Sequence, residues 1–254
     1  MKRSRRSVLG PTVLRKLRRF APLRPLFFVL FGRSYAALWD SFAITDGTAR
    51  EAILAGVGAD EARFWSSGQR DAERYVIPLL RPEAVVLDLG GGIGRIARAV
   101  APHCRRLILA DVSRSMLRRA RNALRGTPNI EFVKTSGKSL ASVASNSVDV
   151  AYSHLVLQHV EREDVISYLG ELHRVLVPGG VIRFQVPNLA DPQQLSTYVE
   201  YALATPAKSL GRLRYYTREE IQLLLERLGF SIESVESTEW HVVTARRGSA
   251  SQQR

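Results

Sequence analysis

The sequence predicts an α/β protein built on a doubly wound, mostly parallel sheet of seven strands. Between residues 85 and 186, short apolar runs rich in β-branched residues alternate with amphipathic helical patterns. The glycine-rich turn at residues 90–94 directly follows the first apolar run. Two further segments, residues 231–236 and 240–245, are separated by a short polar turn and predict antiparallel closing strands.

The chain of 254 residues is long enough for one large domain with appendages. We expect a basic arm at residues 1–39, a helical cap at 40–82, the main domain at 83–247 and a disordered tail at 248–254. The single cysteine, Cys104, excludes an internal disulfide and a Cys-rich zinc site, and we expect no metal. A lone cysteine also fits a reducing compartment, so we expect a cytoplasmic protein.

The arm carries most of the positive charge. Residues 1–39 hold ten Lys and Arg and no Asp or Glu, whereas the remainder holds 27 Lys and Arg against 24 Asp and Glu. The nearly balanced remainder disfavours an extended nucleic-acid footprint. Val13, Leu14, Leu17 and Phe20 recur at helical spacing between basic residues, which predicts a short amphipathic helix of the kind that lies on anionic membranes.

Alternatives for this arm stay open: a solvated tail, a helix packed on the domain, or an organelle transit peptide. The apolar run at residues 26–31 is far shorter than the about 20 residues that span a bilayer. We therefore expect peripheral contact with an anionic membrane surface through residues 1–33. The sequence does not indicate an oligomeric state.

The cap at residues 40–82 consists of short helical patterns. Asp60 is placed to cap a helix that carries Phe64 and Trp65. The segment 66–68, Ser-Ser-Gly, indicates either a turn or a join between two helices. The aromatic pair covers a ligand in one interpretation and packs on the sheet in the other.

The first strand, residues 85–89, leads into the turn that organises the main domain. Asp88 is followed by Gly90, Gly92 and Gly94, a pattern that lets backbone approach a ligand at a helix N-terminus. A nicotinamide-binding fingerprint would need glycine at position 95, where Arg95 stands. No Gly-Lys-Ser/Thr follows, so the sequence also excludes a P-loop.

The next strands are expected at residues 106–110, 130–133 and 148–152. Asp111 ends the first of these runs, residues 106–110, where a carboxylate accepts both hydroxyls of a ribose. His154 and His159 follow the strand at 148–152 and therefore lie at the carboxyl edge of the sheet, where ligands of such sheets bind.

A helix is expected at residues 163–176, and Pro178-Gly179-Gly180 is expected to turn into a strand at 181–185. About 30 residues then intervene before the helix expected at residues 218–228, and this insertion is a candidate substrate lid. It begins with a helix from Asp191-Pro192 and contains Tyr198, Tyr215 and Tyr216 as candidate substrate contacts, together with the basic residues Lys208, Arg212 and Arg214. Thr217 and Glu220 predict a capping box for the helix at 218–228.

The ordered set of motifs resembles a class I S-adenosylmethionine-dependent methyltransferase of the small-molecule, ubiquinone/menaquinone-biosynthesis-like type. The resemblance covers about residues 83–245 and implies a Rossmann-like sheet. The motifs are Leu87-Asp88-Leu89-Gly90-Gly91-Gly92-Ile93-Gly94-Arg95, Ala110-Asp111-Val112-Ser113 with Met116-Leu117, residues 148–153, Gln158-His159-Val160, residues 174–180, residues 216–220 and Gly229-Phe230.

The resemblance implies a role for each matched residue. Asp88, Gly90, Gly92 and Gly94 would hold the methionine half of S-adenosylmethionine. Asp111 would take the ribose hydroxyls, Val112 would pack on the adenine, and Ser136 with Gly137 would meet the adenine amino group. Ser153 and His154 would line the mouth where the methyl group is transferred. Two positions depart from the pattern: Gly91 stands where Cys or Ser is frequent, and Ser136 where Asp is usual.

We therefore expect an enzyme that transfers a methyl group from S-adenosylmethionine to a small molecule, most simply to oxygen. His154 and His159 are the candidate general bases, although each also fits a packing role. The alternatives are an RNA or protein methyltransferase, or a protein that keeps the fold without catalysis. After the strand at 148–152, Ser153-His154-Leu155-Val156 replaces the Asn/Asp-Pro-Pro-Tyr signature of nucleic-acid amino methylation.

Overall fold

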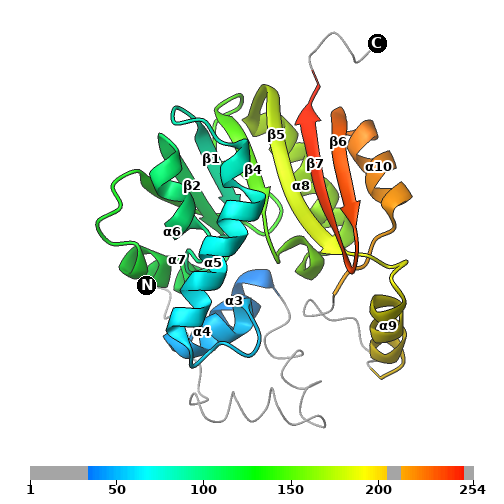
Figure 1. Ribbon diagram of the computed structural model, residues 1–254, viewed down its shortest axis with the longest axis horizontal. Helices are drawn as coiled ribbons and strands as arrows, with labels where there is room; N and C mark the ends of the chain where they lie inside the picture. Colours follow the sequence, from blue (N-terminus) through cyan, green and yellow to red (C-terminus); the bar gives the residue numbers. More distant parts are fainter. Residues whose placement is uncertain (1–33, 205–212, 249–254) are drawn as a thin grey trace, which may run out of the picture.

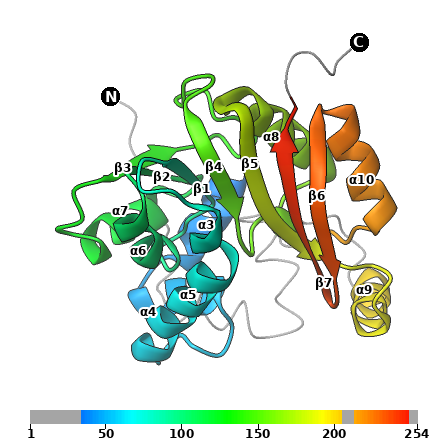
Figure 2. The same ribbon diagram turned by 45° about the horizontal axis from the view of Figure 1, so that its top comes forward.

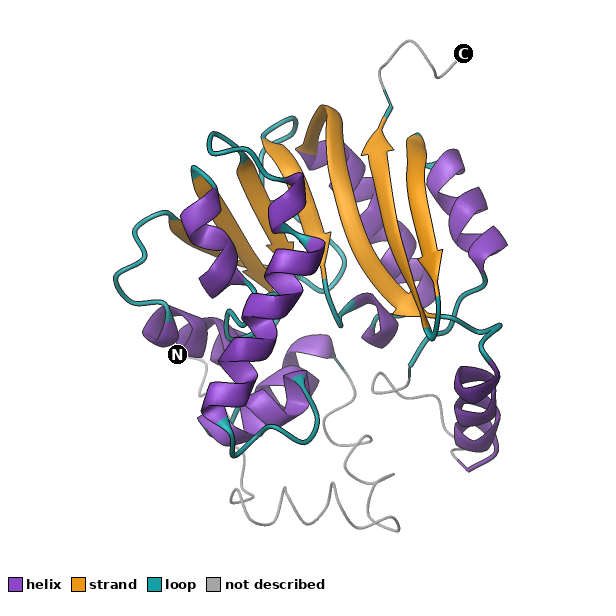
Figure 3. Cartoon of the chain, viewed as in Figure 1, coloured by secondary structure: helices purple, strands orange, loops and turns teal. Residues whose placement is uncertain are grey.

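The computed structural model describes residues 34–204 and 213–248. Its centre is the seven-stranded sheet that the sequence predicts (Figures 1 and 3). The strand order in this sheet is β3-β2-β1-β4-β5-β7-β6. The strands are β1 Val85–Leu89, β2 Arg106–Asp111, β3 Ile130–Lys134, β4 Val148–Ser153, β5 Leu176–Pro187, β6 Phe230–Ser237 and β7 Trp240–Arg247. The first five are mutually parallel, and β7 runs antiparallel to both β5 and β6.

Helices cover both faces of this sheet (Figures 1 and 2). On one face lie α5 Glu61–Tyr75, α6 Ala97–Val100 and α7 Arg114–Ala123, and on the other lie α8 Arg162–Val175 and α10 Arg218–Arg227. Helix α9, Pro192–Ala204, stands apart at the carboxyl edge of the sheet. Short 3₁₀ segments are η2 Ile77–Leu79, η3 Ala101–His103 and η4 Leu157–His159.

The central strand β1 is buried along its whole length, because helices cover both of its faces. Leu87 and Leu89 join the apolar core on the α8 side, whereas Val86 belongs to the core on the α5–α7 side. This placement brings the carboxyl ends of β1, β2 and β4 together at one edge, where the glycine turn and His154 follow their strands.

Two local expectations were wrong in detail. Residues 178–180 belong to β5, because Leu176 already pairs with Val148 and the strand passes through a register shift instead of a turn. Gly179 accommodates this irregularity with φ +78°.

The segment 66–68 is neither a turn nor a join, since α5 runs through it unbroken. Gly68 sits against the backbone of Arg95, so the helix passes close to the glycine turn.

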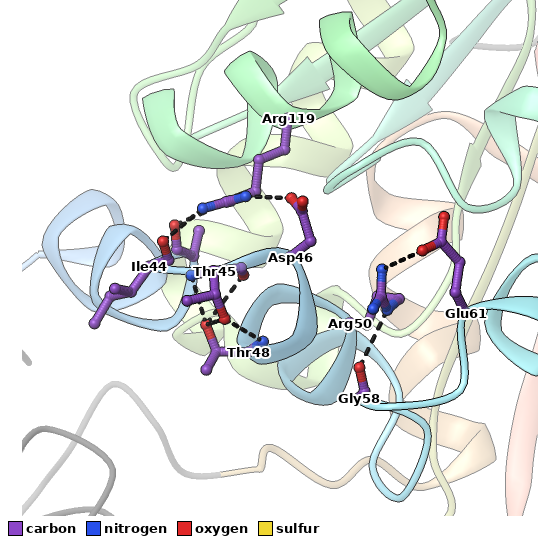
Figure 4. Close-up of polar contacts among 9 residues, drawn as sticks. Ile44, Thr45, Asp46, Thr48, Arg50, Gly58, Glu61 and Arg119 are labelled. Carbon is purple, nitrogen blue, oxygen red and sulfur yellow. Dashed lines mark hydrogen bonds and ion pairs between the residues drawn. The ribbon is translucent and has the colours of Figure 1, made fainter. Parts of the chain in front are cut away.

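Helices α3 Tyr35–Phe42 and α4 Asp46–Ile53 form the described beginning of the chain. Arg119 of α7 fastens the connection between them: its Nε and Nη2 donate to the carbonyls of Ala43 and Ile44 at 3.1 and 2.6 Å, and it pairs with Asp46 (Figure 4). Arg50 donates to the carbonyl of Gly58 at 3.2 Å, which ties α4 to the start of α5.

The predicted amphipathic segment at residues 11–20, the apolar run 26–31, Lys208 and Arg212 lie outside the described residues. Helix α3 runs across the expected boundary between residues 39 and 40. Within residues 34–204 and 213–248, no helix combines the length and the apolar character needed to cross a bilayer.

Candidate active site

A cavity opens at the carboxyl edge of the sheet. Its wall combines the glycine turn, the ends of β2 and β4, and side chains from α3, α4 and α8. The residues are Tyr35, Trp39, Ile53, Leu89, Gly90, Gly92, Asp111, Val112, Met116, Thr135, Gly137, His154, Leu155, Val156, His159, Val160 and Tyr168. Among these described wall residues there is one carboxylate and no Lys or Arg.

The glycine turn needs its glycines for both conformation and space. Gly90 and Gly92 have φ values of +79° and +57°. A Cβ at Gly90 would lie 2.5 Å from the side chain of Val156, and one at Gly92 would lie 2.9 Å from Ile53. The backbone therefore approaches the cavity more closely than any side chain would allow. Gly94 has φ +88° but is not among the described residues of the cavity wall. A Cβ at Gly94 would meet the side chain of Leu124, at the end of α7.

Asp111 presents its carboxylate at the cavity wall. Oδ2 accepts a hydrogen bond from the Gly92 backbone at 2.9 Å, and Oδ1 accepts one from the Ser113 backbone at 2.8 Å. Burial raises the pKa of Asp111 to about 6, against the lowering effect of these backbone donors. Both oxygens retain a lone pair, so the fixed carboxylate can accept hydrogen bonds from a diol.

Asp88 lies beneath the glycine turn rather than on the cavity wall. A Cβ at Gly91 would come within 2.8 Å of its Oδ2 and 2.6 Å of Leu109, so Gly91 leaves room for this carboxylate. Burial raises the pKa of Asp88 to about 7, with Tyr152 opposing the shift. The geometry gives Asp88 a supporting position under the turn.

The remaining expected cofactor residues divide into two groups. Val112 and Gly137 line the cavity, and Thr135 lies beside them with its hydroxyl 3.1 Å from that of Tyr168. Ser136 is exposed and is absent from the described cavity wall. Ser153 is buried and donates to the carbonyl of Leu89 at 3.1 Å, which ties the end of β4 to the end of β1.

Helix α3 closes the outer side of the cavity. The Tyr35 hydroxyl donates to Asp164 at 2.8 Å and accepts from the Glu161 backbone at 2.8 Å, so it is anchored at the start of α8. Burial raises the pKa of Tyr35 well above its ordinary value. One turn further on, Asp40 accepts from the Ser113 hydroxyl at 2.6 Å and the Ser115 backbone at 2.9 Å at the start of α7. The helix thus bridges both flanks of the opening.

His154 forms a buried polar chain with α5. Its Nε2 lies 3.3 Å from Oδ2 of Asp71, and the same oxygen accepts from Nη1 of Arg95 at 2.5 Å. Burial raises the pKa of Asp71, but His154 and Arg95 outweigh that effect and hold the pKa below its ordinary value. Arg95 also donates to Ser67 at 3.1 Å. Asp71 therefore holds the imidazole of His154 through its Nε2 side.

His159 also faces the cavity but differs from His154 in its surroundings. Its ring makes an edge contact with Trp39, with centroids 5.3 Å apart. Burial, aided by the positive charge of Arg214, lowers the pKa of His159 to about 4. The imidazole is therefore neutral at physiological pH and is a weaker base than an unperturbed histidine.

The three candidate substrate tyrosines do not reach the described cavity wall. Tyr198 on α9 is 40% exposed and packs against Tyr215, with ring centroids 5.3 Å apart. Tyr216 is buried in the core below the guanidinium of Arg162, 4.8 Å from its ring centroid. Their role in substrate binding stays a prediction.

Sequence reasoning did not identify several wall and network residues: Tyr35, Trp39, Ile53, Thr135, Tyr168 and Asp71. Their common signal is weak, because most lie on helices whose docking on the sheet is a tertiary property. Tyr35 and Trp39 of α3 were assigned to the arm at residues 1–39. Within the described part of the chain, no three His, Cys, Asp or Glu side chains converge as a metal site.

The sheet order, the glycine turn and the carboxylate at the end of β2 are those of the class I S-adenosylmethionine-dependent methyltransferase fold. Residues 87–184 match the family model described as "Methyltransferase domain". The chain therefore contains a methyltransferase domain of the class that uses S-adenosyl-L-methionine.

Relatives support the same assignment. The chain is 31% identical over 150 residues to the tRNA 5-carboxymethoxyuridine methyltransferase of Escherichia coli (strain K12), which covers 58% of this chain and 51% of the relative. It is 30% identical over 163 residues to the ubiquinone/menaquinone biosynthesis C-methyltransferase UbiE of Hydrogenovibrio crunogenus, covering 61% and 63%. The chain thus spans about half to two thirds of the length of these relatives.

A solved structure shares the fold at lower identity. Magnesium protoporphyrin IX methyltransferase from Synechocystis PCC 6803, with bound SAH, superposes with a TM-score of 0.61 at 18% identity, covering 83% of this chain and 98% of that one.

The described cavity fits S-adenosylmethionine on its own chemistry. Gly90 and Gly92 form a cradle that a Cβ would fill, and Asp111 offers acceptors for a ribose. Val112 and Met116 add an apolar surface for a base. The described wall offers a carboxylate and no Lys or Arg, which favours a cationic sulfonium over a diphosphate.

Proposed function

We propose that this chain transfers the methyl group of S-adenosylmethionine to an oxygen atom of a small-molecule acceptor, with His154 as the general base. The observation that carries the proposal is the pairing of His154 with Asp71 at the wall of the cavity. The cofactor supplies an activated methyl group, so the protein needs to align the acceptor and remove its proton.

Each residue then has a defined task. The glycine turn and Asp111 hold the donor, Asp71 fixes the orientation of His154, and His154 takes the acceptor's proton as the new bond forms. Trp39 and Tyr35 of α3, with Ile53 of α4, cover the cavity and exclude water from it. The enclosed wall supports a small acceptor over a folded protein segment.

Binding of the cofactor is the first test. Isothermal titration calorimetry with S-adenosylmethionine is expected to show one site, and Asp111→Ala is expected to weaken binding at least about tenfold, since hydrogen bonds to a charged group contribute about 1.5–3 kcal/mol. Glu226→Ala, an exposed carboxylate on α10, is the matched control. Equal affinity of the two variants would reject the assignment of Asp111.

The acceptor is the second test. Incubation with sugars, polyketides and quinone precursors, followed by mass detection of a 14-Da gain, is expected to identify a substrate whose conversion falls strongly in His154→Gln and less in His159→Gln. Carbon methylation would appear as a product that resists demethylation by ether-cleaving reagents. A larger loss in His159→Gln would transfer the base role to that residue.

RNA methylation is the second candidate. It is favoured by the similarity to a tRNA methyltransferase of Escherichia coli and by three exposed arginines on α7, Arg114, Arg118 and Arg121. Methyl transfer from labelled cofactor to total tRNA, with no transfer to small molecules, would select it. The contact of residues 1–33 with anionic membranes also stays a proposal. Flotation with anionic liposomes tests it, and equal binding with and without those residues would remove it.

A further inference from the structure

One segment of the chain concentrates arginines that a whole-domain charge count averages out. Residues 94–130 contain nine Arg, no Lys or Glu, and a single Asp, which is the buried Asp111. Three of the nine have carboxylate partners: Arg95 pairs with Asp71, Arg106 with Glu131 and Arg119 with Asp46. The other six are exposed, and we call them the arginine surface: Arg98, Arg105, Arg114, Arg118, Arg121 and Arg125.

Half of this surface is a single stripe on α7. Arg114, Arg118 and Arg121 are spaced four and three residues apart, so they share one side of the helix, and Arg125 follows two residues beyond the last helical residue, Ala123. Met116, Leu117 and Ala120 are buried on another side, which fixes the stripe toward solvent. From Arg114 to Arg121 the stripe extends about 10 Å along the helix axis. It begins two residues beyond Val112, which lines the cavity.

The charges of the stripe are uncompensated. Within residues 34–204 and 213–248, Arg114, Arg118 and Arg121 of the stripe form no ion pair, and neither do Arg98, Arg105 and Arg125. Arginine forks match phosphate oxygens with two parallel hydrogen bonds, which an ammonium group cannot do. A surface with only arginine and no carboxylate partner is therefore complementary to a row of phosphates.

Two of the six arginines lie on aromatic rings. The guanidinium of Arg98 is 5.0 Å from the ring centroid of Trp65, and that of Arg121 is 5.1 Å from the ring of Phe132. Both rings are half-buried and carry a guanidinium group over one face. Arginine and aromatic side chains of this kind are groups on which unpaired bases stack in RNA-binding proteins.

The positions of the exposed apolar side chains indicate whether the arginine surface binds a nucleic acid or a membrane. The exposed large apolar residues of the described chain lie on α8, α9 and α10, at Ile166, Leu195, Tyr198, Val199, Leu203 and Leu223. None lies on the arginine surface, so this surface has nothing to insert into a lipid bilayer.

We propose that the arginine surface binds the phosphate backbone of single-stranded RNA. This binding goes beyond the proposed methyl transfer and stands whether or not RNA is the acceptor. The phosphates would follow the α7 stripe from Arg114 near the cavity opening, and bases would stack at Arg121 and Arg98.

The test measures salt-dependent RNA binding by the full chain. Fluorescence anisotropy with a labelled oligouridine of about 12 nucleotides is compared for Arg114→Ser/Arg118→Ser and for Arg218→Ser/Arg227→Ser, a control on α10 with the same loss of charge. Each lost phosphate contact lowers the slope of log K against log salt by about 0.7, so the α7 variant is expected to lose about 1.4 in slope and about 25-fold in affinity at about 0.1 M salt.

The parent protein and both variants retain the basic arm at residues 1–39, so any RNA binding by the arm is the same in all three. Unchanged binding by the α7 variant relative to the α10 control would overturn the proposal. So would a variant that keeps RNA binding but loses sedimentation with phosphatidylserine vesicles, because the surface would then serve lipid. Calorimetry with S-adenosylmethionine checks that both variants are folded, and it keeps a failure here distinct from a failure of the methyltransferase proposal.

Discussion

The carboxylate of Asp71 lies 3.3 Å from Nε2 of His154 and joins helix α5 to the loop that follows β4. Arg95, the residue that ends the glycine turn, binds the same oxygen. One carboxylate thus connects the glycine turn to the candidate base.

Replacement of this carboxylate tests the orienting role directly. In Asp71→Asn, methyl transfer to the acceptor found by screening is expected to fall about 10–100-fold, toward the loss typical of a misaligned general base, whereas cofactor affinity changes little. Nitrogen NMR of His154 is expected to show that Nε2 loses its fixed proton. Glu73→Gln, an adjacent carboxylate on α5 that pairs with Gln69, should show neither effect. An unchanged tautomer and unchanged turnover would refute the role.

The glycine turn allows conformation and space to be separated. Gly92→Ala is expected to abolish cofactor binding in calorimetry, because the new methyl group would press on Ile53 at a positive φ. Gly126→Ala has φ +91° with open space around it, so it should lose only about 1–2 kcal/mol of stability and keep its affinity. Gly170→Ala in α8, with open space and ordinary φ, should be neutral or stabilising. If Gly126→Ala also lost cofactor binding, the loss in Gly92→Ala could be attributed to backbone strain at positive φ without the contact with Ile53.

The buried carboxylates make stability depend on pH. The folded pKa values of Asp88 and Asp111, about 7 and about 6, exceed the ordinary value of 3.8. Their contribution to the unfolding free energy is therefore full below about pH 4 and is lost as pH rises through 6 to 7. A bound sulfonium offsets the buried negative charge. The rise in melting temperature caused by S-adenosylmethionine is thus expected to grow between about pH 5 and pH 8.

Differential scanning fluorimetry with and without the cofactor measures this rise. Asp88→Asn should remove much of the pH dependence of the cofactor-free protein and raise its stability at about pH 8. A cofactor-induced rise that is flat across the range, with Asp88→Asn like the parent chain, would contradict the assigned pKa values.

The anchoring of α3 predicts the rate at which the cofactor leaves. Tyr35→Phe removes one hydrogen bond to Asp164 and one from the Glu161 backbone, each contributing about 0.5–1.5 kcal/mol. Stopped-flow fluorescence of Trp39 is expected to show dissociation about tenfold faster. Tyr198→Phe, whose hydroxyl is on the exposed helix α9, is the control. Equal rates in both variants would show that α3 does not limit release.

The strands were predictable because their patterns are local. The run 85–89 and the turn at 90–94 carry their own signal, and the capping of α5 by Asp60 was correctly expected, with its side chain accepting from the Arg63 backbone at 2.8 Å. The strand character of residues 178–180 was not predictable, since Pro and Gly indicate a turn unless pairing with β4 overrides them.

The candidate site divides in the same way. Asp111, Val112 and His154 follow strands and were placed by their position in the sequence, whereas Asp71 and Tyr35 act from helices that reach the site only after packing. The arginine surface was hidden for a related reason. A total of 27 basic and 24 acidic residues says nothing of where each lies, and helix periodicity gathers Arg114, Arg118 and Arg121 on one side.

The described cavity wall carries Asp111 without a Lys or Arg, and this has a consequence for turnover. Methyl transfer converts a sulfonium into a neutral thioether, so the cofactor loses one positive charge in each cycle. A carboxylate wall binds the charged form better than the spent form. Under the proposed function, we expect this charge to weaken product inhibition and to favour the exchange of spent for fresh cofactor.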